Sequence, residues 1–143
     1  QKGQGIKKIA NKNDFIEFFK NNPQCYLIQE FLKIDGDIRV LVVGKKILGA
    51  IKRTVLKNDF RSNVSLGAKI KKIELTTIMK KVALKATELM GYEIAGVDLI
   101  EYNNKIYVLE VNSTPEWQGF KKVTGINPAK EIINYAIKKY EKI

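Results

Sequence analysis

Residues 94–112 read IAGVDLIEYNNKIYVLEVN, and this stretch decides both the fold and the chemistry expected of the chain. Two apolar runs flank the dipeptide Asn103-Asn104, which is typical of a tight turn between antiparallel strands. The polar side chains in these runs include two acids and one amide that can meet on one face, Asp98, Glu110 and Asn112. The stretch therefore predicts a β-hairpin that carries an acidic and amide cluster.

The register of this hairpin decides whether the three groups meet. Glu110 and Asn112 are two residues apart on one strand, so they point to the same face. A two-residue turn would pair Asp98 with Leu109 and place Asp98 on the opposite face. A three-residue loop, 103–105, would pair Asp98 with Glu110 instead. Four apolar residues would then share the other face: Val97, Leu99, Leu109 and Val111. Because a one-residue slip inverts every side chain, burial favours the second register.

Two carboxylates side by side on a sheet repel each other unless a cation lies between them. Asp98, Glu110 and Asn112 offer only oxygen ligands, which suit Mg²⁺ held together with phosphate oxygens. A solvated hairpin edge would show the same pattern. The residues alone leave both interpretations open.

A second predicted hairpin, closed at Gly44-Lys45, carries a charged cluster. A two-residue turn there would place Asp37 opposite Lys52, with Arg39 on the same face. These charges interrupt otherwise apolar strands. They form either a surface ion-pair ladder or a face that binds polyphosphate.

Two short segments are also suited to phosphate. Arg61, Ser62 and Asn63 offer a bidentate fork, a hydroxyl and an amide. Gly3 and Gly5 would allow backbone N–H groups to approach a phosphate, but on the residues alone a simple turn is the favoured explanation.

The whole pattern predicts an α+β fold, in which helices pack on a largely antiparallel sheet. The expected strands are 6–10, 25–31, 37–43, 46–55, 94–102 and 106–111. The expected helices are 14–20 after the N-cap Asn13, 75–90 before Gly91, and 128–141 after Asn127. Residues 57–69 and 112–125 are expected to be loops. The helix over 75–90 is expected to bury Leu75, Ile78, Val82, Ala86 and Leu89.

Composition narrows the function classes. The 143 residues carry 26 Lys and Arg against 15 Asp and Glu, a net charge of +11 that attracts anions. The absence of histidine excludes His-based triads and His-ligated zinc. The single cysteine, Cys25, cannot form an internal disulfide, which fits a reducing cytoplasm. We expect a cytoplasmic protein without a membrane partner, since there is no signal peptide and no apolar run near the ~20 residues of a membrane span.

Five segments occur in the order found in a known family. They are 29–31 (QEF), 37–44 (DIRVLVVG), 59–63 (DFRSN), 95–98 (AGVD) and 109–115 (LEVNSTP). The series closely resembles the RimK-type ATP-grasp ligases, which include glutamate ligases acting on a ribosomal protein and on archaeal coenzymes. The resemblance covers nearly the whole chain, and its most specific parts are 59–63 and the Glu-Val-Asn-x-x-Pro run.

The resemblance implies roles for individual residues. Asp98, Glu110 and Asn112 match the magnesium ligands of the family. Arg53 and Arg61 match catalytic positions that stabilise charge on the transferred phosphoryl group. Further positions match nucleotide-contacting ones: Gly3, Gly5, Glu30, Phe31, Asp37, Arg61, Ser62 and Asn63.

The resemblance also implies a reaction. ATP and Mg²⁺, with Mn²⁺ as a substitute, would drive the joining of an amino acid to a carboxylate through an acyl phosphate. Glutamate is the expected amino acid; the carboxylate acceptor is open, and so is the oligomeric state, a homo-oligomer included. Residues 1–143 would be the carboxy-terminal part of an ATP-grasp domain, inactive without an upstream domain and the first half of the ATP-grasp region.

Two other functions remain as alternatives. A basic module that binds nucleic acid would explain the net charge and aromatic residues such as Tyr102 and Trp117. It would not explain an Asp–Glu–Asn face, which repels phosphate in the absence of metal. A non-catalytic fragment that keeps the fold would explain all the motifs without turnover.

Overall fold

The computed structural model describes residues 6–54 and 69–141. The chain forms two compact units, Gln1–Lys33 and Ile34–Ile143. The first unit contains the helix α1 (Lys12–Asn21). The second contains β1 (Gly36–Val43), β2 (Lys46–Thr54), β3 (Lys69–Ile73), α2 (Thr77–Leu89), β4 (Ile94–Tyr102), β5 (Lys105–Asn112), α3 (Gln118–Thr124) and α4 (Pro128–Tyr140).

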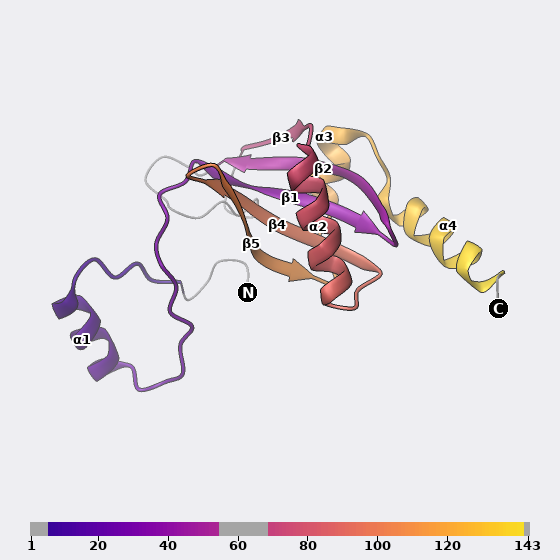
Figure 1. Ribbon diagram of the computed structural model, residues 1–143. Helices are drawn as coiled ribbons and strands as arrows, with labels where there is room; N and C mark the ends of the chain where they lie inside the picture. Colours follow the sequence, from indigo (N-terminus) through magenta and orange to yellow (C-terminus); the bar gives the residue numbers. More distant parts are fainter. Residues whose placement is uncertain (1–5, 55–68, 142–143) are drawn as a thin grey trace. The chain divides into compact units, whose positions relative to one another are not determined.

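One antiparallel sheet organises the second unit. Its strand order is β3-β2-β1-β4-β5, so β1 and β4 lie at the centre and β5 is an edge strand. Helix α2 runs across one face of this sheet (Figure 1). The predicted α+β class with a largely antiparallel sheet is confirmed.

The sheet face under α2 holds the larger core. Val40, Val97 and Leu99 are completely buried there, and Met79 and Ala83 pack on them from α2. The opposite face holds a smaller core in which Phe120 of α3 contacts Leu41 and Ile51. Alternate residues of β1 therefore face two different cores, which leaves the charged residues of β1 beside the smaller one.

The buried stripe of α2 differs from the predicted one. Ile78 and Leu89 are exposed, whereas Met79, Ala83 and Thr87 are buried. Leu75 is buried as predicted, and Val82 and Ala86 pack partly buried against the core, so the buried face of the helix is rotated by about one residue from the expected one. The predicted end of this helix is confirmed, since Gly91 follows it with a φ of 68°.

Several other predictions were wrong. Residues 6–10 and 25–31 do not form strands; the described part of their unit contains only a helix, so neither has a strand to pair with. Helix α1 begins two residues early, because Asn11 and not Asn13 accepts the N-terminal hydrogen bonds. Strand β3 was not predicted and overlaps the expected loop only at Lys69, and helix α3 lies within the segment 112–125 that was expected to be a loop. In the part of the chain that the structure describes, no helix is long and apolar enough to cross a membrane.

Candidate active site

The hairpin of β4 and β5 brings Asp98 opposite Glu110, as predicted, but by another route. Its turn has two residues, Asn103 and Asn104, both with positive φ, which is the form that suits tight hairpins. A β-bulge at Leu109 then adds the one residue that restores the predicted pairing. The expected three-residue loop is wrong, and Leu109, 46% exposed, does not share the buried face.

A second bulge, in β2, shifts the register of the hairpin formed by β1 and β2 by one residue. The predicted two-residue turn is present, but β2 gains a residue beside Leu41 and Val42. Asp37 therefore lies opposite Arg53, and the predicted pairing with Lys52 is wrong. Lys52 points to the other face of the sheet and donates a hydrogen bond to Asp35 at 2.6 Å.

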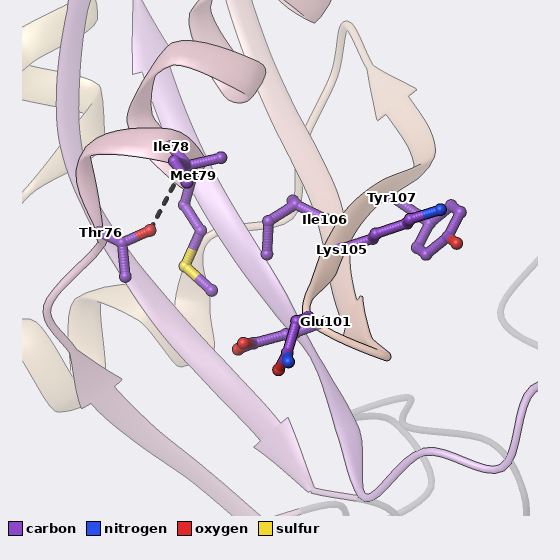
Figure 2. Close-up of a pocket in the computed structure, with 8 residues that line it drawn as sticks. Thr76, Ile78, Met79, Glu101, Lys105, Ile106 and Tyr107 are labelled. Atoms are coloured by element: carbon purple, nitrogen blue, oxygen red, sulfur yellow. Dashed lines mark hydrogen bonds between the residues drawn. The ribbon is translucent and has the colours of Figure 1, made fainter.

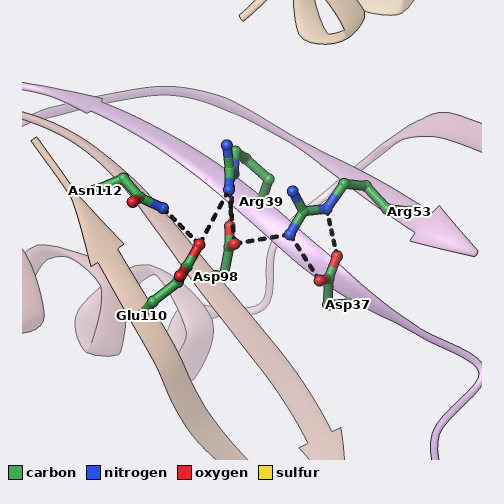
Figure 3. A network of polar contacts seen from close by, with 6 residues as sticks. All are labelled: Asp37, Arg39, Arg53, Asp98, Glu110 and Asn112. Atoms are coloured by element: carbon green, nitrogen blue, oxygen red, sulfur yellow. Dashed lines mark hydrogen bonds and ion pairs between the residues drawn. The ribbon is translucent and has the colours of Figure 1, made fainter. Parts of the chain in front are cut away.

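The two bulges assemble a network of five charges across four strands (Figure 3). Arg39 donates to both carboxylate oxygens of Asp98, Nε to Oδ1 at 2.6 Å and Nη2 to Oδ2 at 2.7 Å. Arg53 donates to both oxygens of Asp37, at 2.6 and 2.7 Å, and its Nη2 also donates to Asp98 at 2.7 Å. Glu110 lies at the open end, 3.6 Å from Nη2 of Arg39.

Most of this network is shielded from solvent, which strengthens its interactions. The Asp98 side chain is 4% exposed, whereas that of Glu110 is 58% exposed. Burial acts to raise the pKa of Asp98, but hydrogen bonds and charge from Arg39 and Arg53 outweigh it, so the pKa lies below the ordinary value. Burial likewise acts to lower the pKa of Arg53, while Asp37 and Asp98 raise it above the ordinary arginine value.

Glu110 and Asn112 form the open side of the network. The Asn112 amide Nδ2 donates to Glu110 Oε1 at 2.7 Å, so the Asn112 Oδ1 atom is left to act as a ligand. Asp98 accepts three hydrogen bonds, and a carboxylate has about four lone-pair positions, so one position on Oδ1 remains. Two carboxylates and one amide, all oxygen donors on one face, fit a magnesium ion.

This set differs from an all-acid metal centre. Among the described residues, no group of three or more Asp, Glu, Cys or His side chains is arranged to hold a metal ion. Here the third candidate ligand is an amide, and the charge of Asp98 is largely offset by two arginines. Glu110 and Asn112 therefore make up the accessible part of the candidate site.

Gly96 provides the space in which the network is built. It precedes Asp98 by two residues on β4, and a Cβ added to it would lie 2.7 Å from Cβ of Pro115 and 3.5 Å from Cδ of Arg39. Pro115 belongs to the Glu-Val-Asn-x-x-Pro run and is itself buried. The run after β5 can therefore fold back over β4 only because residue 96 lacks a side chain.

Replacing Gly96 by Ala tests this packing. We expect Gly96→Ala to lower the free energy of unfolding by about 1–3 kcal/mol, because the added methyl overlaps Pro115. Urea unfolding followed by circular dichroism measures the change. Unfolding of Gly96→Ala at the same urea concentration as wild type would contradict the close packing of Pro115 against Gly96.

Other predicted site residues lie elsewhere. Glu30 and Phe31 belong to the first unit, where both are exposed and Nζ of Lys8 lies 4.0 Å from the ring centroid of Phe31. Five predicted residues lie outside the described part of the chain: Gly3, Gly5, Arg61, Ser62 and Asn63. The sequence placed Arg39 only in a cluster that was either an ion-pair ladder or a polyphosphate face; its bidentate contact with Asp98 on the neighbouring hairpin was not predicted.

The family of the chain follows from a direct comparison with known proteins. A model of the RimK-like ATP-grasp domain matches residues 2–136. The chain belongs to this family. A probable alpha-L-glutamate ligase of Legionella pneumophila (strain Corby) is 41% identical over 130 residues, covering 90% of this ATP-grasp chain and 43% of the relative. The tetrahydromethanopterin:alpha-L-glutamate ligase of Methanocaldococcus jannaschii is 38% identical, covering 94% of this chain and 50% of the relative.

Solved structures show the same fold. The D-alanine–D-alanine ligase of Bacillus anthracis complexed with ATP superposes with a TM-score of 0.69 at 18% identity, over 97% of this chain and 50% of that one. The ATP-grasp ligase PsnB complexed with a minimal precursor gives a TM-score of 0.61 at 23% identity, over 76% and 35%. The chain thus spans about half or less of the proteins that it matches.

A hollow of about 450 Å³ lies away from this network. It is bordered by the start of α2 and by the β4–β5 turn, and it includes Thr76, Met79, Glu101 and Tyr107 (Figure 2). The Met79 backbone N–H donates to Thr76 Oγ1 at 3.2 Å, which caps α2. None of the predicted site residues of this ATP-grasp chain lines the hollow, so its geometry adds nothing to the candidate site.

The low pKa of Asp98 predicts how stability depends on pH. A carboxyl whose pKa is lower in the folded state stabilises the fold above the unfolded-state pKa, about 3.9 for Asp, and this contribution is lost as the pH falls through the folded value. We expect the stability difference between wild type and Asp98→Asn to shrink below about pH 4. Urea unfolding of both proteins between pH 3 and pH 7 measures it. A constant difference across that range would contradict the charged pairing of Asp98.

Proposed function

We propose that this chain forms part of a ligase that uses ATP and Mg²⁺ to join an amino acid to a carboxylate. Membership of the ATP-grasp family supports this proposal. The names of the two relatives, both alpha-L-glutamate ligases, support glutamate as the amino acid. One relative modifies tetrahydromethanopterin, which makes a coenzyme carboxylate a candidate acceptor. Peptide acceptors are the other candidate, since another structure of PsnB is complexed with precursor peptide PsnA2.

The proposed reaction has two steps. A carboxylate oxygen of the acceptor attacks the γ-phosphorus of ATP, the bond to the β–γ bridging oxygen breaks, and ADP leaves an acyl phosphate behind. The amine of the amino acid then attacks the acyl carbon and loses a proton, and inorganic phosphate leaves. Held by Asp98, Glu110 and Asn112, a Mg²⁺ ion would screen the phosphate oxygens and help to orient the γ-phosphoryl group. No protein nucleophile is needed, so positioning and charge are the contribution of the chain.

The single observation that carries the proposal is the meeting of three oxygen donors on one sheet face. Glu110 and Asn112 would hold the metal ion from the open side, and Asp98 would hold it through its remaining lone pair. Mn²⁺ is expected to replace Mg²⁺, because the donor set is the same for both.

Arg53 is proposed to act on the phosphates. Asp37 and Asp98 engage its Nε and Nη2 atoms, so its Nη1 group is left to donate to an oxygen of the transferred phosphoryl group. Asp37 would then have two roles: it holds the Arg53 side chain in place, and it contacts the nucleotide. The remaining residues proposed for nucleotide binding are Gly3, Gly5, Glu30, Phe31, Arg61, Ser62 and Asn63, with Arg61 also acting on the phosphoryl charge.

Calorimetry tests the proposal on this chain and on the full-length protein that contains it. We expect the full-length protein to bind ATP with Mg²⁺ and to lose this binding when EDTA removes the metal. We also expect ADP release that depends on glutamate and on an acceptor from a panel of coenzyme and peptide carboxylates. ATP binding by the full-length protein that is indifferent to Mg²⁺ would contradict the proposal.

A further inference from the structure

A guanidinium group lies where the two facing carboxylates need a cation. Asp98 and Glu110 are directly opposite each other on neighbouring strands, an arrangement that is unfavourable for like charges. Arg39 reaches both: its Nη2 donates to Asp98 Oδ2 at 2.7 Å and lies 3.6 Å from Glu110 Oε1 (Figure 3). The repulsion between the two acids is therefore offset within the chain, without a metal ion.

The sheet fixes Arg39 in this place. Arg39 pairs with Asp98, and Asp98 pairs with Glu110, so the three residues form one row across β1, β4 and β5. The Arg39 side chain is only 11% exposed, and its Cδ lies over Gly96, where a Cβ would come within 3.5 Å. This arginine has little freedom to move toward a ligand.

The two arginines hold Asp98 in different ways. Arg39 supplies two of its three hydrogen bonds, in the planar bidentate form that fixes a carboxylate in orientation as well as position. Arg53 supplies one, and its own bidentate partner is Asp37. The orientation of Asp98 therefore depends mainly on Arg39, while Arg53 is oriented mainly by Asp37.

We propose that Arg39 is a positioning residue of the metal site. It holds the Asp98 carboxylate so that its remaining lone pair faces Glu110 and Asn112, and it keeps the two acids together before a metal ion binds. Arg39 itself touches neither the ion nor the phosphates. This inference rests on the proposed function, and it assigns to Arg39 a role distinct from that of Arg53.

Two substitutions in the full-length protein test the role. Arg39→Met keeps the length of the side chain but removes the charge, and Arg39→Lys keeps the charge but removes the planar fork. The control Lys52→Met removes a cation from the adjacent strand whose ion pair with Asp35 lies on the opposite face. The readout is the dissociation constant of Mn²⁺ in the presence of ADP, measured by water-proton relaxation, with circular dichroism to verify folding.

We expect Arg39→Met to weaken Mn²⁺ binding by about 10- to 100-fold, the range found when a group that orients a metal ligand is removed. Arg39→Lys is expected to recover part of this loss, and Lys52→Met to stay within about twofold of wild type. In turnover assays the loss should be relieved by raising Mg²⁺, with the KM for glutamate unchanged.

Two outcomes would overturn the inference alone: wild-type or tighter Mn²⁺ binding by Arg39→Met, or wild-type binding by Arg39→Lys, which would show that the fork is not needed. If Arg39→Met does not fold, Mn²⁺ binding by Arg39→Lys decides whether the inference holds. Absence of Mn²⁺ and ADP binding by the wild-type protein would overturn the proposed function, and the inference with it.

Discussion

We expect Glu110→Gln to lower the turnover of the proposed full-length ligase by at least about 100-fold. This is the upper end of the loss found when a residue that only supports a metal ligand is removed. Glu110 is the accessible carboxylate of the candidate site, since Asp98 is largely engaged by two arginines. An amide keeps the shape of the side chain but removes the negative charge that attracts the ion. ADP release with saturating ATP, Mg²⁺ and glutamate measures the effect.

A matched control is available on the same hairpin. Glu101 is an exposed acid of β4 that points to the opposite face of the sheet, beside α2. Glu101→Gln makes the same chemical change and should leave turnover within about twofold of wild type, because surface charges of this kind contribute little. Equal turnover of Glu110→Gln and Glu101→Gln would show that Glu110 does not hold the metal ion.

The second large effect is expected for Arg53→Met, which should lower the free energy of unfolding of the chain. Arg53 supplies three hydrogen bonds to Asp37 and Asp98, two carboxylates that are almost fully buried. Removing one partner of a buried ion pair leaves an uncompensated charge, which typically destabilises a protein by about 3–5 kcal/mol. We expect a loss toward the lower value, because Arg39 continues to hold Asp98.

Urea unfolding measures this loss against Lys46→Met. Lys46 is paired with Glu131 at 3.2 Å, but its side chain is 71% exposed, so its removal should change stability by less than about 1 kcal/mol. If Arg53→Met and Lys46→Met unfold at the same urea concentration, the buried network contributes no more than a surface pair.

The sequence predicted that Asp98 and Glu110 lie opposite each other, but not how the backbone brings them together. The opposition of Asp98 and Glu110 followed from requiring one apolar face, and that requirement holds for Val97 and Leu99. A two-residue turn followed by a bulge places these apolar residues on one face just as a three-residue loop would. Only Asn103-Asn104, which tolerates positive φ, pointed to the shorter turn.

A bulge is hard to predict because it inserts one residue without a distinctive residue type. The bulge in β2 replaced Lys52 by Arg53 as the partner of Asp37, and this single step turned a surface pair into a buried one. Strand β3 was missed for a related reason. Its sequence, KIKKI, is that of a charged edge strand, in which lysines protect the unpaired side and resemble a polar loop.

The account depends most directly on where the metal ion lies. A crystal structure of the full-length protein with Mg²⁺ and a non-hydrolysable ATP analogue measures this position. We expect a magnesium ion about 2.1 Å from a carboxylate oxygen of Glu110 and from Oδ1 of Asn112, with phosphate oxygens completing its coordination. A nucleotide-bound ion with neither residue among its ligands would contradict the account.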